Sequence, residues 1–141
     1  MDEWERRRGR VTVLTPHEGE FLRVGGDLSQ GRTAAAEDFA RRSGAVVVLK
    51  GPGTVVAWPD GRCRVNTTGN CGMAKGGSGD VLSGVVLALL GLGMDAFDAC
   101  CCAVWLHGRA GDLAAQEKGQ WGMTPTDLLE RLPQALREVT E

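Results

Sequence analysis

The sequence has no large excess of either charge and few aromatic side chains. Its 16 Lys and Arg residues stand against 18 Asp and Glu residues, which gives a formal net charge of -2. A nucleic-acid-binding protein needs a positive surface to face the phosphate backbone, and this balance does not provide one. Aromatic residues make up 5% of the chain, and Trp58, Trp105 and Trp121 lie too far from basic clusters to stack bases. We therefore expect no nucleic-acid partner.

Long apolar runs are also missing. The longest strongly apolar run, residues 81–92, contains Ser83 and two glycines and is too short to cross a bilayer. Residues 1–10 are polar and lack the apolar region of a secretory signal. These features predict a soluble, cytoplasmic protein with no membrane partner. A length of 141 residues suits one domain.

The five cysteines do not form a disulfide or zinc-binding pattern. Their number is odd, and Cys100, Cys101 and Cys102 are adjacent in a predicted helix, where neighbouring side chains point in different directions. The spacings C-x-x-C and H-x-x-x-H, which would indicate zinc, do not occur. We interpret the cysteines as reduced thiols that act as small apolar residues.

The first third of the chain predicts a strand, a helix and a second strand. Residues 11–14 are a short β-branched run, and residues 45–49 are continuously apolar, as expected of a strand buried in a parallel sheet. Between them, residues 29–43 have a helical pattern that Gly44 ends. This order predicts one right-handed βαβ unit. A short helix is also expected directly after the first strand, with Thr15 as its N-cap, Pro16 at its first position and Glu18 completing a capping box.

The rest of the chain predicts a hairpin followed by helices. Two short runs flank Pro59-Asp60-Gly61, a turn signal. The predicted fold is therefore α/β, with strands first, helices last, and a mixed sheet of about four strands with helices packed on it. The strands of the hairpin are expected at 54–58 and 62–66, and the helices at 80–92, at 95–117 and from Thr124-Pro125 onward.

The 21 glycines concentrate between apolar segments, most clearly in the run Gly69-Asn-Cys-Gly-Met-Ala-Lys-Gly-Gly-Ser-Gly-Asp80. This run leads directly into an apolar helix, so it presents unpaired N–H groups and the positive end of the helix dipole to a ligand. The sequence thus predicts an anion site, although the spacing is neither that of a P-loop nor the dinucleotide pattern G-x-G-x-x-G.

Asp80 stands at the edge of this anion site. A carboxylate there would repel an anion unless it took a proton from a nucleophile, which is the work of a general base. The alternative is that Asp80 only caps the following helix. The two roles are compatible, but capping alone does not explain the glycines that precede it.

A second candidate site follows the strand at 45–49. In open α/β sheets, ligands bind at the carboxyl ends of strands, where Lys50-Gly51-Pro52-Gly53-Thr54 lies. Lys50 could meet a phosphate as a point charge, and the glycines would let a nucleotide approach the backbone. The alternative is an ordinary Gly-Pro turn with a solvated lysine. His17, also beside a strand end, is expected near the start of a helix on the surface, and His107 is interpreted as a packing residue or a hydrogen-bond donor.

Five segments in this order resemble one family, the ADP- or ATP-dependent NAD(P)H-hydrate dehydratases of the ribokinase-like superfamily. The similarity is to the carboxyl-terminal half of that domain and covers residues 11–139, whereas residues 1–10 have no counterpart. The resemblance implies a partial ribokinase-like layered fold for residues 11–141. The segments are Thr15-Pro-His-Glu-Gly-Glu20, Lys50-Gly-Pro-Gly-Thr54, Thr68 to Gly84, His107-Gly-Arg-Ala-Gly-Asp-Leu-Ala-Ala115 and Thr126-Asp-Leu128.

The resemblance implies a repair reaction that turns hydrated NADH or NADPH back into the working cofactor. The reaction is a kinase step, with ADP or ATP as phosphoryl donor, followed by an elimination. Asp80 would deprotonate the hydroxyl of the hydrate, and the N–H groups of Gly77, Ser78 and Gly79 would hold the transferring phosphoryl group. Lys50, Gly51, Pro52, Gly53, Thr54 and Gly79 would bind the nucleotide, and His17 would contact the hydrated dinucleotide. Magnesium is expected, with ligands that the sequence does not identify.

The chain departs from the family at two positions and in length. Glu18 stands where proline is common, and Lys75, where threonine is usual, adds positive charge beside the anion site. The family domain is about twice this size, a plausible single domain, and its amino-terminal half has no counterpart here. Two alternatives to an active or partner-completed dehydratase follow: an inactive nucleotide-binding fragment that needs a partner half, and a ribokinase-like kinase of a small alcohol. The Gly69-Asn-x-Gly-Met-Ala stretch favours the dehydratase over that kinase.

We predict that the chain self-associates or is completed by another chain. Without the other half of the sheet, the strand at 11–14 or that at 46–49 would lack a neighbour, and an exposed apolar edge strand pairs readily with another copy. Light scattering across micromolar concentrations should show a rise in mass. A strictly monomeric mass over that range would contradict the prediction.

Overall fold

The computed structural model describes residues 6–7 and 9–141, and these form two compact units that meet in sequence between Val65 and Asn66. The polar segment 1–10 includes residues 1–5 and 8, which lie outside the described part. No described helix combines the length and apolarity needed to span a bilayer.

The first unit is built on a mixed sheet of four strands, as the sequence predicts. β1 pairs with β2 in parallel, and the hairpin strands β3 and β4 continue the sheet in antiparallel fashion. β2 has a neighbouring strand on each side, so the strand at 46–49 is not an edge strand of the sheet. β1 is an edge strand. The strands are β1 (Val13–Leu14), β2 (Val46–Leu49), β3 (Val55–Ala57) and β4 (Cys63–Val65).

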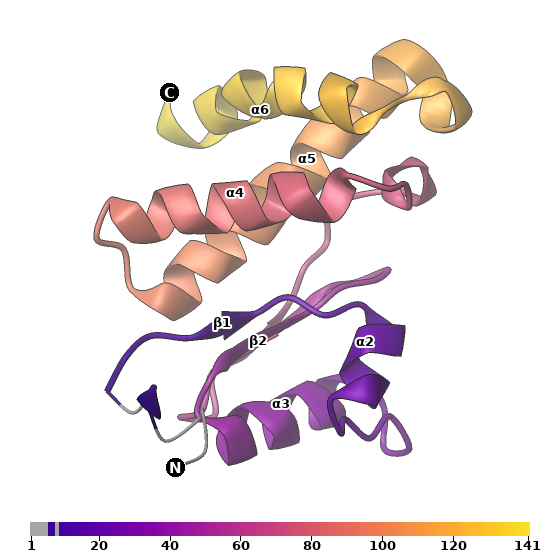
Figure 1. Ribbon diagram of the computed structural model, residues 1–141. Coiled ribbons are helices and arrows are strands. Elements are labelled where there is room, and N and C mark those ends of the chain that lie inside the picture. The colour runs from indigo at the N-terminus through magenta and orange to yellow at the C-terminus, as the bar shows by residue number, and fades with distance from the viewer. Residues whose placement is uncertain (1–5, 8) are drawn as a thin grey trace. The chain divides into compact units, whose positions relative to one another are not determined.

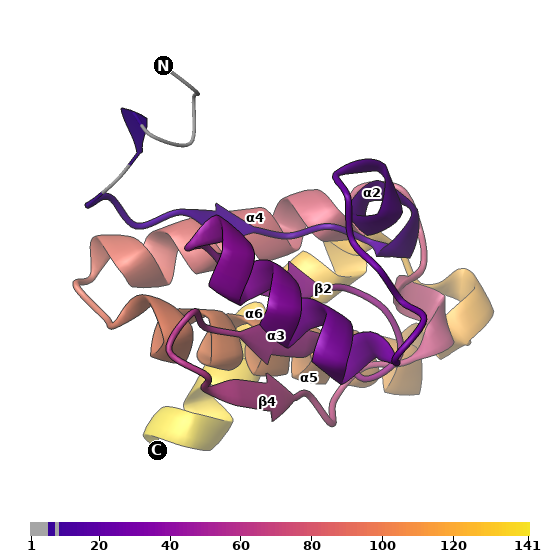
Figure 2. The same ribbon diagram turned by 90° about the horizontal axis from the view of Figure 1, so that it is seen from below.

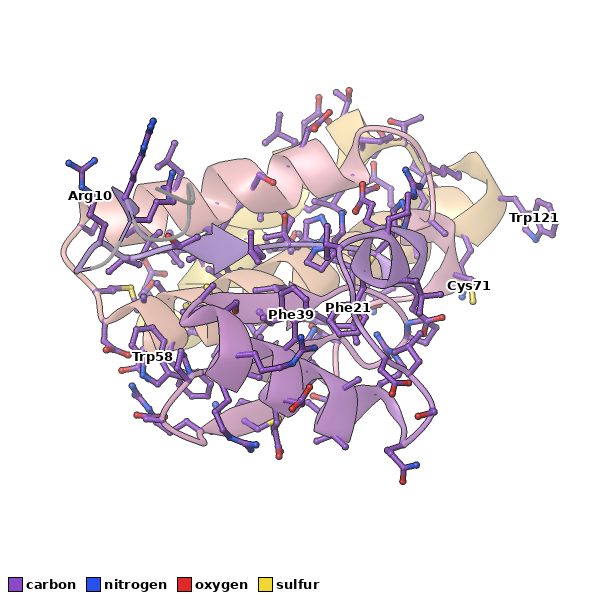
Figure 3. The ribbon with its side chains drawn as sticks, turned by 60° about the horizontal axis from the view of Figure 1, so that its bottom comes forward. Arg10, Phe21, Phe39, Trp58, Cys71 and Trp121 are labelled. Carbon is purple, nitrogen blue, oxygen red and sulfur yellow. The ribbon has the colours of Figure 1, made fainter. Side chains whose placement is uncertain are left out.

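Two helices, α2 (Glu18–Arg23) and α3 (Arg32–Ser43), complete this unit. α3 covers one face of the sheet (Figures 1 and 2). The rings of Phe21 and Phe39 pack together, as Figure 3 shows, and their centroids are 5.3 Å apart. These rings join a core whose other members are Ala35, Ala36, Ala40, Val47, Leu49, Val55 and Ala57.

Both helices begin later than the sequence predicts. The N-cap of α2 is His17, not Thr15, because His17 pairs with Lys50 in an isolated parallel bridge that keeps the backbone extended past Pro16. The predicted start of the second helix at residue 29 is wrong by three positions, since an Asp27–Ser29 turn and Gly31 at φ 92° precede Arg32. Gly44 ends α3 in the left-handed conformation, as predicted.

The second unit is helical apart from its first residues. Asp95 caps α5. The last helix starts at Thr124-Pro125, as predicted, and Thr124 forms a capping box with Asp127. Gly119, at φ 74° and ψ 157°, interrupts the helical backbone of α5, so the regular part of the helix ends close to the predicted residue 117 and a short further piece runs to Gly122. The elements are η1 (Cys71–Met73), α4 (Ser78–Gly91), α5 (Ala96–Gly122) and α6 (Pro125–Thr140).

α5 is the centre of the second unit's core, and α6 packs along it (Figure 1). Ion pairs tie the two helices together, among them Arg109 with Glu138, at 2.7 Å, and Arg131 with Glu117. The bond from Arg109 lowers the pKa of the Glu138 carboxyl. The buried side chains of this core are Leu106, Ala110, Leu113, Leu128 and Ala135.

Gly108 lets the incoming chain lie directly on α5. A Cβ added there would lie 2.2 Å from the Thr68 hydroxyl oxygen and 2.7 Å from the Thr68 carbonyl carbon. The Thr68 hydroxyl also donates to the Trp105 carbonyl, at 2.9 Å. The backbone of Thr68 therefore rests where a side chain would otherwise be.

We predict that Gly108→Ala destabilises the protein by about 2 kcal/mol, because overpacking against fixed backbone outweighs the gain in helix propensity. Gly84→Ala is the matched control, since Gly84 is an exposed helical residue of α4 whose added Cβ meets no described atom within 4 Å. This control should stabilise by about 0.5–1 kcal/mol. Urea unfolding measures the change in the free energy of unfolding for each substitution. Equal changes for the two substitutions would contradict the packing described.

Cys100 is fully buried in α5, in keeping with the apolar role predicted for the cysteines. Burial raises the pKa of its thiol to about 12, because the thiolate is poorly solvated there. Cys71, by contrast, is exposed on η1 (Figure 3).

Iodoacetamide at pH 8 should therefore label Cys71 within minutes and leave Cys100 unmodified in the folded protein. At that pH the Cys100 thiol is almost entirely protonated, and only the thiolate reacts. Peptide mass spectrometry gives the site-by-site rates, and labelling in guanidinium is the control in which both react. Equal native rates at the two positions would overturn the assignment.

Candidate functional site

The glycine-rich segment is anchored to α5 at its beginning. The carboxylate of Asp112 accepts from the backbone N–H of Gly69, at 3.1 Å, and from the side-chain amide of Asn70, at 2.9 Å. The Asn70 side-chain oxygen in turn accepts from the N–H of Gly72, at 2.9 Å, and starts η1. One acidic side chain thus positions the first turn of the segment.

Lys75 anchors the same segment further along. Its ammonium group donates to the carbonyls of Gln120, Trp121 and Met123. These carbonyls close α5, and the end of a helix is its negative pole, which favours a cation. The positive charge that the sequence places beside the anion site is therefore bound to the end of α5.

The segment then opens into the N-terminus of α4. Its N-cap is Gly77, at φ 100°, where an added Cβ would lie 3.3 Å from Pro125. The first helical bond runs from the Val81 N–H to the Gly77 carbonyl, at 3.2 Å. The Ser78 N–H donates to the Lys75 carbonyl, also at 3.2 Å, whereas the N–H groups of Gly79 and Asp80 precede the first helical donor and have no helical acceptor.

Asp80 is the third residue of α4 and is exposed. The alternative that it is the helix cap is wrong, because Gly77 occupies that position and has no side chain with which to cap. Asp80 therefore belongs to the first turn of a helix whose N-terminus has no side-chain cap, and the backbone N–H groups of such a terminus can bind an anion.

His107 supports this helix start from α5. It is buried, and its Nε2 lies 2.9 Å from the Ser78 carbonyl oxygen. Because a carbonyl only accepts, Nε2 carries the proton and donates. The interpretation of His107 as a hydrogen-bond donor is confirmed, and its bond holds the first residue of α4 in place.

In the first unit, His17 lies next to the second candidate site. The N–H of Lys50 donates to the Pro16 carbonyl, at 2.8 Å, and His17 itself bridges to Lys50. The Nδ1 atom of His17 accepts from the Glu20 N–H, at 3.1 Å, while the Glu20 carboxylate accepts from the His17 N–H, at 2.9 Å. This bond from the backbone lowers the pKa of Glu20. His17 is thus the cap of α2, and its Nε2 faces Glu20 at 3.5 Å.

The segment from Lys50 to Thr54 is held by Arg32, a residue that the sequence analysis missed. The guanidinium donates to the carbonyls of Leu49, Pro52 and Gly53. The Thr54 hydroxyl donates to the Gly51 carbonyl, at 3.1 Å, and so tightens the turn. The one signal in the sequence was an arginine at the expected start of a helix, where the dipole disfavours a cation.

The predicted residues therefore fall into two groups. His17 and residues 50–54 are neighbours in the first unit, and residues 77–80 with His107 are neighbours in the second. Asp112 of the second unit was present in a recognised motif, but its role was not predicted. Within residues 6–7 and 9–141, no group of three or more His, Cys, Asp or Glu side chains is placed to hold a metal ion.

Comparisons with known proteins show the family. The sequence profile of the NAD(P)H-hydrate dehydratase family matches residues 2–134. A bifunctional NAD(P)H-hydrate repair enzyme from Thermofilum pendens is 48% identical over 99% of this chain, which covers 27% of that protein. The ADP-dependent (S)-NAD(P)H-hydrate dehydratase of Bacillus subtilis is 40% identical over 92% of this chain, which covers 48% of it. The chain thus spans about a quarter of the first relative and about half of the second.

Solved structures give the same result for the fold. An ADP/ATP-dependent NAD(P)H-hydrate dehydratase from Bacillus subtilis, co-crystallized with ATP/Mg2+, matches 93% of this chain and 49% of its own with a TM-score of 0.88 at 38% identity. A ribokinase-like superfamily protein from Enterococcus faecalis matches 89% of this chain and 44% of its own with a TM-score of 0.74 at 30% identity. The chain therefore belongs to the NAD(P)H-hydrate dehydratase family, in its ribokinase-like fold.

Proposed function

We propose that this chain takes part in the ADP- or ATP-dependent dehydration of hydrated NADH or NADPH, as the half of the dehydratase domain that carries the base and the phosphoryl site. The observation that carries the proposal is the exposed carboxylate of Asp80 in the first turn of α4, directly after a glycine-rich segment and beside an uncapped helix N-terminus. The substrates in this proposal are those for which the family and its relative are named.

In the first step, Asp80 takes the proton from the hydroxyl group of the hydrate. The hydroxyl oxygen then bonds to the terminal phosphorus of the nucleotide, and the bond from that phosphorus to the bridging oxygen breaks. ADP leaves if ATP was the donor, and AMP leaves if ADP was. In the second step the new phosphate ester leaves as phosphate and the ring loses a proton, so the ring double bond returns.

The N–H groups of Gly77, Ser78 and Gly79 would hold the charge that develops on the transferring phosphoryl group. They lie at the positive end of α4, and no side chain of Gly77 or Gly79 obstructs the approach. The Ser78 N–H bonds to Lys75 at 3.2 Å, near the long end of the normal range, so a phosphoryl oxygen can replace that acceptor. His107 would keep Ser78 in place during the reaction.

In the first unit, residues 50–54 are proposed to bind the adenine nucleotide, and His17 to contact the hydrated dinucleotide. Magnesium is usually bound by one or two carboxylates together with the substrate phosphates. The described residues do not form a metal-binding cluster of their own.

The test is to incubate the protein with NADH hydrate, magnesium and either ADP or ATP, and to follow the absorbance of regained NADH. Nucleotide binding is measured separately by titration calorimetry. ADP binding without turnover would leave nucleotide binding as the function of this stretch of the domain. Turnover with a small alcohol in place of the hydrate would favour the kinase alternative, and absence of nucleotide binding would overturn the proposal.

We predict that Asp80→Asn lowers kcat by at least about a thousandfold and leaves the Kd for ADP within about threefold, because the amide cannot accept the proton but keeps the shape of the side chain. Asp98→Asn is the matched control. Asp98 is likewise an exposed acid in the first turn of its helix, α5, and should leave both constants unchanged. Full turnover by the Asp80 variant would exclude this residue as the base.

A further inference from the structure

Arg32, which the sequence motifs did not single out, donates hydrogen bonds to carbonyls in and next to the proposed nucleotide-binding segment 50–54. Its Nη1 donates to the carbonyls of Pro52 and Gly53, and its Nη2 donates to the carbonyl of Leu49, at 3.0 Å. The side chain is 25% exposed. A Cβ at Gly51 would lie 2.7 Å from Nη2, so the turn closes directly over the guanidinium.

The position of Arg32 in α3 is unfavourable for the helix itself. It is the first helical residue, after Gly31, and a cation at a helix N-terminus meets the positive end of the dipole. The contacts that compensate are those to the turn and to Glu18, not contacts within α3. The residue thus contributes to the turn more than to its own helix.

Because peptide bonds are planar, the hydrogen bonds from Arg32 also fix the direction of the N–H groups in the turn. In a trans peptide, the carbonyl of one residue and the N–H of the next point in opposite directions. With the carbonyls of Pro52 and Gly53 directed at Arg32, the N–H groups of Gly53 and Thr54 point away from it. The same rule holds at Leu49, whose carbonyl faces Arg32 while the Lys50 N–H donates to Pro16.

Glu18 connects this turn to the His17 segment. Its Oε1 atom lies 3.0 Å from Nε of Arg32, as an ion pair in which the N–H is not aimed at the oxygen. Glu18 directly follows the His17 cap, so one guanidinium contacts both the turn at 50–54 and the residue next to His17.

We propose that Arg32 is a positioning residue, which turns the N–H groups of Gly53 and Thr54 outward as paired donors for acceptor atoms of an adenine nucleotide. Glu18 has the lesser role of holding the guanidinium in place. The inference rests on the proposed function for the identity of the ligand and adds a residue that acts through the backbone without touching the nucleotide.

The experiment measures ADP binding by calorimetry and, where turnover occurs, the KM for nucleotide and kcat. The variants are Arg32→Gln, Arg32→Lys and Glu18→Gln, with Arg41→Gln as the matched control because Arg41 is an exposed arginine of the same helix. Arg32→Gln should weaken ADP binding at least about tenfold and raise the nucleotide KM without a matching fall in kcat. Arg32→Lys should recover part of the loss, since an ammonium can reach some but not all of the carbonyls. Glu18→Gln should change binding less than threefold, and Arg41→Gln should leave it unchanged.

Hydrogen exchange separates an effect on the turn from a general loss of stability. In the nucleotide-free protein, Arg32→Gln should raise exchange of the Lys50 amide, whose N–H donates to the Pro16 carbonyl, at least about tenfold, while peptides from α5 keep their protection. ADP binding by Arg32→Gln as tight as in the unchanged protein would overturn the inference and leave the proposed function intact. If the unchanged protein bound no ADP, the proposed function would fail, and with it the ligand assigned to the turn. Equal exchange in both proteins would show that Arg32 does not order the turn.

Discussion

Each of the two glycine-rich segments is held in place by a basic side chain that donates hydrogen bonds to several backbone carbonyls. Holding one residue of a flexible chain in a single conformation costs about 1–2 kcal/mol, and glycine loses the most freedom. Arg32 offsets this cost for residues 49–53, and Lys75 does so for the segment before α4, each through carbonyls of three residues. In the turn held by Arg32, carbonyls and amides alternate in direction along the peptide, so binding the carbonyls on one side leaves N–H groups on the other. Lys75 acts differently, because the carbonyls that it binds close α5 and do not belong to the glycine-rich segment.

α5 has the corresponding role for the second unit. Gly108 admits the backbone of Thr68, Asp112 holds Gly69 and Asn70, and His107 holds Ser78. Glycine in a helix interior is unfavourable by about 1 kcal/mol relative to alanine, so its presence at Gly108 indicates a close approach. One face of one helix therefore determines where the glycine-rich segment starts and where α4 begins, and so where the carboxylate of Asp80 stands.

The strands, the helices of the second unit and the mixed sheet could be predicted, because each depends on local pattern: apolar runs, a turn between two of them, and Thr124-Pro125 at a helix start. The first residues of α2 and α3 could not be predicted in this way. Thr15 and Pro16 form a good local helix start, but the pairing of His17 with Lys50, residues far apart in sequence, keeps that stretch extended. A capping preference of about 1 kcal/mol is easily exceeded by such a pairing.

The sequence by itself determined which chemistry is present: a glycine-rich anion site next to an acid, a second glycine turn after a buried strand, and the motifs of one enzyme family. These are properties of residue type and spacing, which need no knowledge of distant contacts. Only the tertiary structure decided how those residues are held. It showed that Gly77 and not Asp80 occupies the N-cap position of α4, that Lys75 is bound at the end of α5, and that Arg32 holds the turn at 50–54. Long basic side chains reach carbonyls many positions away, and their partners are set by packing rather than by the neighbours in the chain.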